Sequence, residues 1–435
     1  MKAKLLRTIG LAGVLALGAA AASGQTPASA PAAAPGPNPP GWNELVSTLG
    51  DLPARMLAKL TPEQRADPQI QQEVVRFALA SLAHATLDAL GQDGDHPVFM
   101  PAIGQVISIG QPNADTIYRT AKITPGGTYR LRGKRGSVRM ARIAQVAPRV
   151  PGKVDANGMP VLGAPRLVFD INALKVDAQG NFDVIASPTR PAGYTGDWWQ
   201  LQPDTNALMM RWVGSDWGKE IDPSISIERV DGPIARPRPT ATALEARLRA
   251  MPNDITFSAM MFLDHVAKLR EQGFVNKLKI FDVSQAGGLT GQFYYEGAYD
   301  LKPDEALILE AKVPAKCTYH SVILTNELYE TTDWYNNQST LNDAQSRPDP
   351  DGVLRVVISA KDPGVANWID TSGYPTGAIQ GRWTECDSQP VPSLRKVPVS
   401  QIAQLLPSTT AKVTPQERER ILRDRRSALQ QRPLW

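Results

Sequence analysis

The sequence predicts a mainly β protein with flanking helices, built as two tandem β-sandwich or jelly-roll-like domains. One pattern of residues occurs twice, at about 112–217 and about 289–387, and each copy has an Arg-Trp pair near its end. Such a repeat indicates two similar structural units. Within each copy, short runs rich in Val, Ile, Leu, Tyr and Thr are separated by Gly- and Pro-containing turns, which is typical of sandwiches, jelly rolls and barrels. No helical segment alternates with these runs, which disfavours a parallel α/β sheet.

The N-terminus has the pattern of a secretory signal peptide. Lys2, Lys4 and Arg7 precede an apolar run, and small residues around Gly24 offer a cleavage site. The run is shorter than the ~20 residues that a membrane span needs, so we expect a periplasmic or secreted protein, cleaved near Gly24, without a membrane span. Cleavage takes away three positive charges and lowers the formal net charge from +4 to +1. A nearly neutral chain gives no electrostatic case for nucleic-acid binding.

Helical segments are expected before, between and after the two repeats. Thr61 and Thr414 each precede a Pro and stand three residues before a Gln or Glu, which is the signature of a capped helix start. Residues 241–279 are also helical in composition. The expected order is a signal peptide (1–24), a disordered Pro/Ala tether (25–41), an N-terminal helical segment (42–100), a first β repeat (101–237), a helical linker (238–280), a second β repeat (281–398) and a C-terminal helix (399–435).

The two cysteines, Cys317 and Cys386, both lie in the second repeat. An exported protein meets an oxidising compartment, in which paired cysteines form disulfides. We therefore expect a bond that ties an early strand of the repeat to its last strand. Two buried free thiols are the alternative.

The second repeat resembles the bacterial domain-of-unknown-function family 1214. The matching pieces are, in order, GAYDLKPDEALIL, CTYHSVILTN, WYNNQSTLNDAQSR, DPDGVLRVVIS, ANW and GRW. The first repeat, which opens with PNADTIYRTA, resembles the start of that family and of its companion, family 1254. The resemblance implies β-sandwich or jelly-roll domains in an exported protein and implies no activity. Asp115 and Tyr118 have no clean counterpart in GQFYYEGAYD, so we do not expect one site copied identically in both repeats.

Motifs for common catalytic sites are missing from the sequence. His84, His96, His265 and His320 show no metal-ligand spacing, and no Cys-x-x-Cys occurs. We therefore expect neither a metal nor a cofactor. Calcium held by loop carboxylates is the alternative, with Asp349 and Asp351 as candidates, although an ordinary Asp-Gly turn accounts for them. The Gly-x-Ser-x-Gly of α/β-hydrolases is absent, and the short Gly clusters lack the strand–helix context of a phosphate loop.

The main candidate for a ligand site is a run of aromatic and amide side chains in the second repeat. It lies in a loop expected between strands and consists of Trp334, Tyr335, Asn336, Asn337 and Ser339. Flat rings provide stacking surface and amides provide donors and acceptors. This combination suits a small molecule or a glycan. The alternative is a structural loop with Trp334 in the core.

Two further sets of polar residues are candidates for a site. Arg211 and Arg382 occupy matching places in the two repeats and could each bind a carboxylate or phosphate; the alternative is that they pair with a buried Asp and hold the sandwich together. Asn113, Asp115 and Tyr118 lie close together in the first repeat, where Asp115 and Tyr118 are a candidate acid and base. A turn that leads into a strand accounts for Asn113 and Asp115 equally well.

Three hypotheses for the function are compatible with these residues. The first is a non-catalytic envelope protein that binds a small molecule or glycan. The second is an enzyme of acid–base hydrolysis or elimination, with His320, Asp115 and Tyr118 as proton carriers. His320 lies on an apolar strand, so a core histidine is the alternative for that residue. The third is an interaction scaffold without a small ligand.

Overall fold

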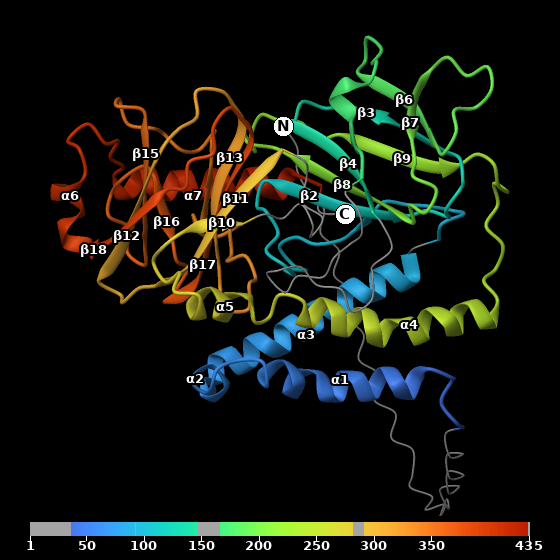
Figure 1. Ribbon diagram of the computed structural model, residues 1–435, viewed down its shortest axis with the longest axis horizontal. Coiled ribbons are helices and arrows are strands. Elements are labelled where there is room, and N and C mark those ends of the chain that lie inside the picture. Colours follow the sequence, from blue (N-terminus) through green and yellow to red (C-terminus); the bar gives the residue numbers. More distant parts are fainter. Residues whose placement is uncertain (1–35, 92, 147–165, 282–290, 434–435) are drawn as a thin grey trace, which may run out of the picture. The chain divides into compact units, whose positions relative to one another are not determined.

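The computed structural model describes residues 36–91, 93–146, 166–281 and 291–433. The chain divides into a short unit that ends at Pro39 and one compact unit from Pro40 onward, to which all described helices and strands belong (Figure 1). The expected signal peptide (1–24) lies outside the described residues, and so does most of the expected tether (25–41).

The first half of the compact unit is a sandwich of two sheets. The sheets have the strand orders β1-β2-β8-β4-β5 and β7-β6-β3-β9. Side chains such as Leu131, Val184 and Trp212 form the apolar core of this half. The strands are β1 (Met100–Pro101), β2 (Thr116–Lys122), β3 (Tyr129–Lys134), β4 (Met140–Val146), β5 (Val168–Asp170), β6 (Asn181–Ser187), β7 (Asp197–Gln200), β8 (Ala207–Val213) and β9 (Ser224–Arg229).

The second half has the same architecture. Its sheets have the orders β10-β11-β17-β13-β14 and β16-β15-β12-β18, which match those of the first half position for position. Each half also has a parallel strand pair at the matching place, β6–β7 and β15–β16. The predicted fold class, mainly β with two tandem sandwich-like domains, is therefore confirmed. The strands are β10 (Lys279–Phe281), β11 (Gln292–Asp300), β12 (Glu305–Lys312), β13 (Cys317–Thr325), β14 (Thr340–Asn342), β15 (Val353–Ser359), β16 (Trp368–Asp370), β17 (Thr376–Cys386) and β18 (Ser393–Pro398).

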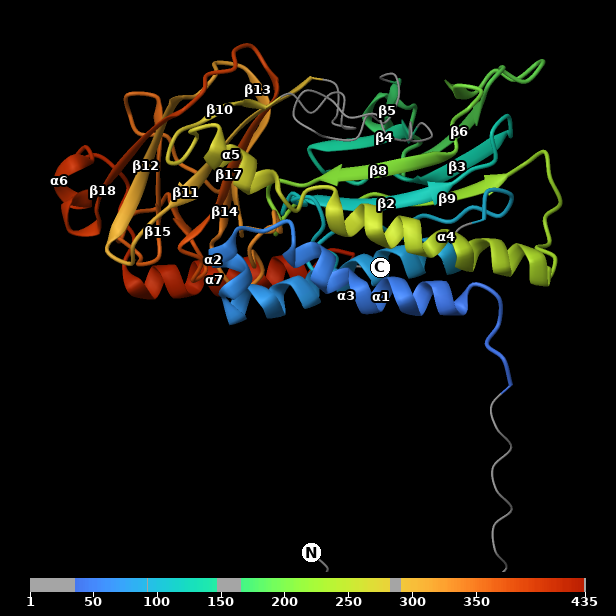
Figure 2. The ribbon, with the colours of Figure 1, turned by 60° about the horizontal axis from the view of Figure 1, so that its bottom comes forward.

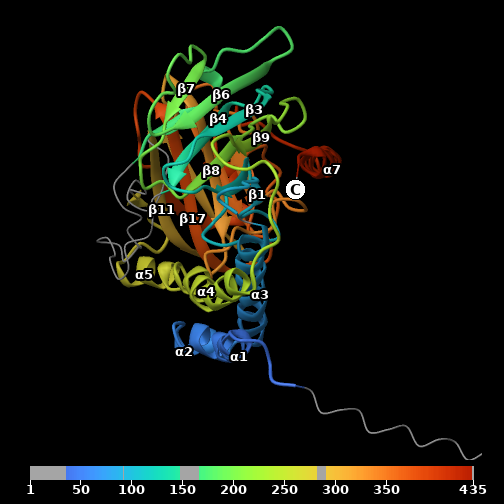
Figure 3. The same cartoon turned by 90° about the vertical axis from the view of Figure 1, so that its right-hand side faces the viewer.

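Three long helices pack against one another. They are α1 (Trp42–Leu57), α3 (Pro68–Gly91) and α4 (Ala241–Met260), and Figure 2 shows them side by side. Leu52, Phe77 and Ile255 belong to the apolar cluster that joins them. The C-terminal helix α7 (Pro415–Gln431) lies apart from this group (Figure 3). The remaining α-helices of the described residues are α2 (Pro62–Ala66), α5 (His265–Glu271) and α6 (Ile402–Leu405).

Both expected helix starts are capped as the sequence indicates. The side-chain oxygen of each threonine, Thr61 and Thr414, accepts a hydrogen bond from the backbone N–H of the residue three positions later. The side chain of that later residue accepts a hydrogen bond from the backbone N–H of the threonine. The helix after Thr61 ends at Ala66, because Pro68 disfavours a helical conformation at the residue before it and starts α3 instead. The interval 241–279, expected to be helical, is broken after Met260, and Lys279 lies in strand β10.

A disulfide joins Cys317 and Cys386, as predicted, and connects directly paired positions of β13 and β17. Of the helices in the described part of the chain, α3 has the length and composition that could cross a membrane. Those two properties are shared by core helices of soluble proteins, and α3 contributes Val74 and Phe77 to the cluster with α1 and α4.

Candidate functional site

A pocket of about 510 Å³ lies between α3, the start of β2 and the loop that carries Trp334. Most of its wall is apolar. Its wall includes Trp334 and Tyr335, which were predicted to bind a ligand, and Tyr118, which was predicted as a candidate acid or base. The wall consists of Leu79, Leu82, Ala83, Thr86 and Leu87 of α3, residues 101–107, Ala114, Thr116, Ile117 and Tyr118, Trp334 and Tyr335, and Leu429, Arg432 and Pro433.

Two residues of the wall, Tyr118 and Gln105, have side-chain atoms with unused hydrogen-bonding capacity. The Tyr118 hydroxyl accepts a hydrogen bond from the backbone N–H of Asn113 at 3.3 Å, and no described residue accepts from it. The side-chain oxygen Oε1 of Gln105 is buried without a partner among the described residues, while its Nε2 donates to Asp333 at 3.0 Å. A buried acceptor without a partner costs free energy, so it favours a ligand that can donate to it.

Asp333 holds the aromatic loop in place. Its Oδ1 accepts hydrogen bonds from the backbone N–H groups of Tyr335 and Asn336, at 2.9 and 3.1 Å, and its Oδ2 accepts from the Asn336 side chain at 2.6 Å. Trp334 is 4% exposed and packs against Tyr335. The loop is therefore a hydrogen-bonded turn. Trp334 packs in a small buried cluster with Trp217 and Leu429, as the structural alternative expected, and both Trp334 and Tyr335 also line the pocket.

The amide and hydroxyl groups of the predicted ligand site do not line this pocket. Asn336 is exposed, Asn337 is half-buried, and Ser339 is buried and donates to the carbonyl oxygen of Thr332 at 3.3 Å. The structure thus separates the two kinds of side chain that the sequence placed in one site. The rings reach the pocket, and the hydrogen bonds of Asn336 and Ser339 stabilise the loop itself.

Asp115 lies at the boundary between the two halves and is 1% exposed. Its Oδ1 accepts from Trp217 Nε1 at 2.8 Å and from Asn342 Nδ2 at 2.7 Å, and its Oδ2 accepts from the Tyr319 hydroxyl at 2.5 Å. Burial raises the pKa of Asp115 against the opposing effect of these hydrogen bonds. Asn113 extends the same network by donating to Tyr319 at 2.8 Å.

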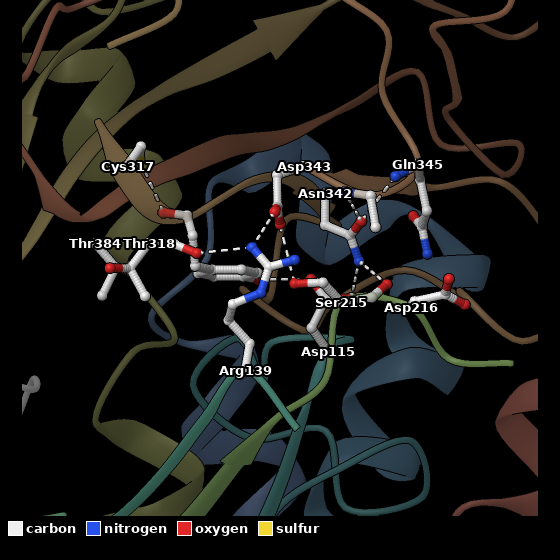
Figure 4. Close-up of polar contacts among 12 residues, drawn as sticks. Asp115, Arg139, Ser215, Asp216, Cys317, Thr318, Asn342, Asp343, Gln345 and Thr384 are labelled. Atoms are coloured by element: carbon white, nitrogen blue, oxygen red, sulfur yellow. Dashed lines mark hydrogen bonds and ion pairs between the residues drawn. The ribbon is translucent and has the colours of Figure 1, made fainter. Parts of the chain in front are cut away.

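A second polar bridge lies next to this network (Figure 4). Arg139 of the first half donates to the Asp343 carboxylate and, at 2.9 Å, to the carbonyl oxygen of Thr318 in the second half. Ser215 donates to the other oxygen of Asp343 at 2.9 Å, and its own carbonyl accepts from Asn342. These contacts join the two halves next to Asp115, whose side chain is buried.

The C-terminal helix closes the same region. Arg432, just beyond α7, forms an ion pair with Asp222 at 2.7 Å and donates to the backbone oxygen of Asp115 at 3.0 Å. Arg425 is buried with its guanidinium 4.5 Å from the centre of the Trp217 ring, and burial lowers its pKa to about 10. Residues of α7 and of the segment just beyond it therefore contribute to both the pocket and the network.

The two predicted arginines occupy equivalent positions in the two halves. Arg211 on β8 is paired in register with Tyr118 on β2, and Arg382 on β17 is paired with Tyr294 on β11. Tyr118 therefore has a counterpart, Tyr294, contrary to the sequence-based expectation; Asp115 precedes β2 and keeps none in β11. Arg382 lies with its guanidinium 4.8 Å from the Tyr294 ring centre and forms no ion pair with a described carboxylate. Neither arginine lines the pocket.

His320 does not join Asp115 and Tyr118 in one site. Its ring packs on Trp383, with the ring centres 5.2 Å apart, and Trp383 belongs to the core of the second sandwich. Its neighbour Tyr319 points the other way, toward Asp115, because successive strand residues face opposite sides. Burial lowers the pKa of His320. No group of three or more His, Cys, Asp or Glu side chains in the described residues is placed to hold a metal ion.

Sequence reasoning missed several residues of the pocket wall, above all Leu82 of α3, Gln105 in the segment 101–107, and Arg432 just beyond α7. Apolar residues on a helix show its buried face but do not tell a pocket wall from a core. Tyr319 was missed for another reason. Its partner Asp115 lies 204 residues away in the sequence, so no local pattern connects them.

No protein-family model and no curated protein matches the chain. Its structure is similar to the crystal structure of an uncharacterised protein from Burkholderia cenocepacia, with a TM-score of 0.74 and 27% sequence identity over 83% of this chain and 98% of that one. A weaker structural match is the VPA0106 protein from Vibrio parahaemolyticus, with a TM-score of 0.40 and 12% identity over 75% of this chain and 98% of that one. The first likeness supports a fold of two tandem β domains.

Proposed function

We propose that this chain is an exported protein that binds one small, largely apolar molecule between α3 and the Trp334–Tyr335 loop. The observation that carries this proposal is the pocket of about 510 Å³ with a mostly apolar wall. Sites for small molecules are commonly of about 300–1,000 Å³, apolar, with a few polar groups that orient the ligand. Removal of apolar ligand surface from water supplies the main driving force, at about 25 cal/mol per Å².

The polar atoms of the wall favour a ligand with one or two hydrogen-bonding groups. The Tyr118 hydroxyl is available as a donor and Gln105 Oε1 as an acceptor, which suits a molecule that carries a carbonyl or a hydroxyl. Arg432 is engaged by Asp222 and by backbone oxygens, so an anionic ligand group is not favoured here. A glycan is not favoured either, because Asn336 and Asn337 lie outside the wall.

A binding protein fits the structure better than an enzyme with the expected proton carriers. Of these residues, only Tyr118 lines the pocket, while Asp115 is enclosed by three hydrogen-bond donors and His320 packs in the second sandwich. A general acid or base must come within hydrogen-bonding reach of the substrate. Export is supported by the disulfide between Cys317 and Cys386, since such bonds persist in oxidising compartments.

Titration with the neutral fluorescent probe N-phenyl-1-naphthylamine tests this proposal. Its fluorescence rises when it leaves water for an apolar site, and we expect saturable binding to the wild-type chain. The variant Ala83→Trp places a large ring at the pocket from an exposed position of α3. We expect it to weaken binding at least tenfold, equivalent to about 1.4 kcal/mol.

The matched control is Ala54→Trp, at an exposed position of α1 that does not line the pocket. It is expected to bind the probe as the wild type does. A wild-type chain that shows no saturable binding, or equal affinity in the Ala83→Trp and wild-type chains, contradicts the proposal. Displacement of the probe by 2-undecanone but not by sugars would support an apolar ligand with a carbonyl group.

A further inference from the structure

A second pocket, of about 560 Å³, lies between the end of α3, the segment 236–239 and the first part of α4. It shares no residue with the pocket described above. Its apolar surface comes chiefly from Leu90, Leu244, Leu248 and Met251. Leu90 and Leu244 are 70% and 50% exposed, so apolar surface remains open to solvent at this place. Exposed apolar surface that lines a pocket is typical of a binding site.

The charged residues that line this pocket are all arginines: Arg236, Arg238 and Arg247. Asp93, which is not part of the lining, lies 2.9 Å from Arg236 Nε and 3.9 Å from Arg247 Nη2. The carboxylate of Asp93 is therefore shared between the guanidinium groups of Arg236 and Arg247. Arg238 is exposed and forms no side-chain hydrogen bond or ion pair with any residue that the structure describes. The pocket rim thus carries excess positive charge beside an apolar surface.

The segment that carries two of these arginines is conformationally restricted. Arg236 and Arg238 alternate with Pro237 and Pro239, whose rings fix the backbone φ angle. Arg247 projects from the first part of α4, a regular helix. Binding groups that are held on restricted backbone lose less conformational entropy when a ligand binds.

We propose that this pocket binds an amphipathic anion, with an apolar chain against Leu244 and Leu248 and a phosphate or carboxylate group at Arg238 and Arg247. Guanidinium groups form paired, charge-assisted hydrogen bonds with both kinds of oxyanion. The same chemistry is offered by a free amphiphile in solution and by an anionic lipid in a bilayer. This site is separate from the pocket beside Trp334. An experiment can therefore contradict the proposal for one pocket and leave the proposal for the other intact.

Calorimetric titration of the full chain with decyl phosphate, below its micelle concentration, tests the site. Decanol and inorganic phosphate serve as probes for the chain and the headgroup alone. We expect decyl phosphate to bind at least tenfold more tightly than either of them. The double variant Arg238→Gln/Arg247→Gln should weaken decyl phosphate binding at least tenfold and leave decanol binding unchanged. It leaves the ion pair of Arg236 with Asp93 in place.

Two further variants make the result specific. Leu244→Asn alters an exposed side chain of the apolar surface and should weaken decyl phosphate but not inorganic phosphate. Arg395→Gln removes an exposed arginine on β18, far from the pocket in sequence and absent from its lining, and should change nothing. Equal decyl phosphate affinity in the double variant and the wild type, or no binding at all, overturns the proposal. If inorganic phosphate binds as tightly as decyl phosphate, the proposed contact between an apolar chain and the pocket is wrong.

The source of the ligand is decided by sedimentation with vesicles. If the ligand is a bilayer lipid, the wild-type chain should pellet with phosphatidylglycerol vesicles but not with phosphatidylcholine vesicles, and the double variant should remain in solution. If the ligand is a free amphiphile, decyl phosphate should bind while neither kind of vesicle pellets the chain. Vesicle binding that is equal in the double variant and the wild type contradicts a role for these arginines in lipid recognition.

Discussion

The hydroxyl of Tyr319 donates a 2.5 Å hydrogen bond to Oδ2 of Asp115, and this contact joins the second half of the molecule to the first. Both groups are fully buried, and Trp217 and Asn342 complete the hydrogen bonding of the carboxylate. In an interior of low dielectric such a network is strong when it is complete and costly when one member is missing. We infer that it stabilises the arrangement of the two halves.

The variant Tyr319→Phe tests how much this contact contributes to the free energy of unfolding. The change removes one donor from Asp115 and one acceptor from Asn113, and leaves both groups buried. We expect the free energy of unfolding to fall by about 1–3 kcal/mol, as measured by urea denaturation. Tyr194→Phe is the control, because the Tyr194 hydroxyl makes no side-chain hydrogen bond with a described residue, and it should have little effect. Equal stability of the two variants would show that the network does not stabilise the fold.

The raised pKa of Asp115 predicts a pH dependence of stability. Burial raises the pKa of this carboxyl group in the folded chain, whereas in the unfolded chain it is ordinary, at about 3.9. The folded state then holds the proton more tightly, so the stabilisation is complete below pH 3.9 and is lost as the pH rises through the folded pKa. The free energy of unfolding of the wild type, minus that of Asp115→Asn, should therefore decrease from pH 4 upward.

Denaturation of both chains in urea between pH 4 and pH 8 measures this difference. Other carboxylates titrate in both chains and cancel in the comparison. A difference that increases with pH would mean that the hydrogen bonds from Tyr319, Asn342 and Trp217 outweigh burial and lower the pKa of Asp115.

Tyr118→Phe separates polar recognition from apolar binding in the pocket. The loss of the hydroxyl removes the donor that we assign to a ligand carbonyl, while the ring and the pocket volume remain. We expect the dissociation constant of 2-undecanone to rise about 2–10-fold, as for a hydrogen bond worth about 0.5–1.5 kcal/mol. The dissociation constant of undecane, measured by displacement of the same probe, should not change. An equal effect on both ligands would indicate altered packing rather than a lost hydrogen bond.

Removal of the disulfide should lower stability without changing the fold. Cys317 and Cys386 are 69 residues apart in the sequence, so their bond restricts the unfolded chain strongly. We expect Cys317→Ala/Cys386→Ala to lose about 2–4 kcal/mol of unfolding free energy, measured by urea denaturation. The far-UV circular dichroism should stay the same, because β13 and β17 remain paired along their length. A lost β spectrum would show that the bond is required for the second sandwich to form.

The fold class could be predicted because its determinants are local and repeated. Short strands, turns and the recurring Arg-Trp pairs mark each sandwich, and Arg211 and Arg382 do lie at equivalent positions of β8 and β17. Helix limits were less predictable. The interval from Ala241 is helical in composition as far as Lys279, yet Lys279 pairs with Glu296 in a sheet. The secondary structure of such segments is determined by tertiary pairing rather than by intrinsic helix propensity.

The candidate site was predictable only in part. Trp334, Tyr335 and Tyr118 were singled out from the sequence, and all three line one pocket. Most of the remaining wall comes from α3, residues 101–107, the start of β2 and the C-terminal end of the described chain, which are far apart in the sequence. Leu82 and Leu429 have the pattern of ordinary core residues. Their common pocket depends on how the helices are placed against the β halves, and no local spacing contains that information.

The most direct test of the central claim is a crystal structure of the chain soaked with 1-bromodecane, with bromine located by its anomalous scattering. Binding of an apolar molecule beside Trp334 predicts a bromine peak inside the pocket between α3, Tyr118 and Tyr335. The same peak should be missing from crystals of Ala83→Trp. Bromine bound only at other places, or an empty pocket in crystals that hold bromodecane elsewhere, would contradict the proposed function.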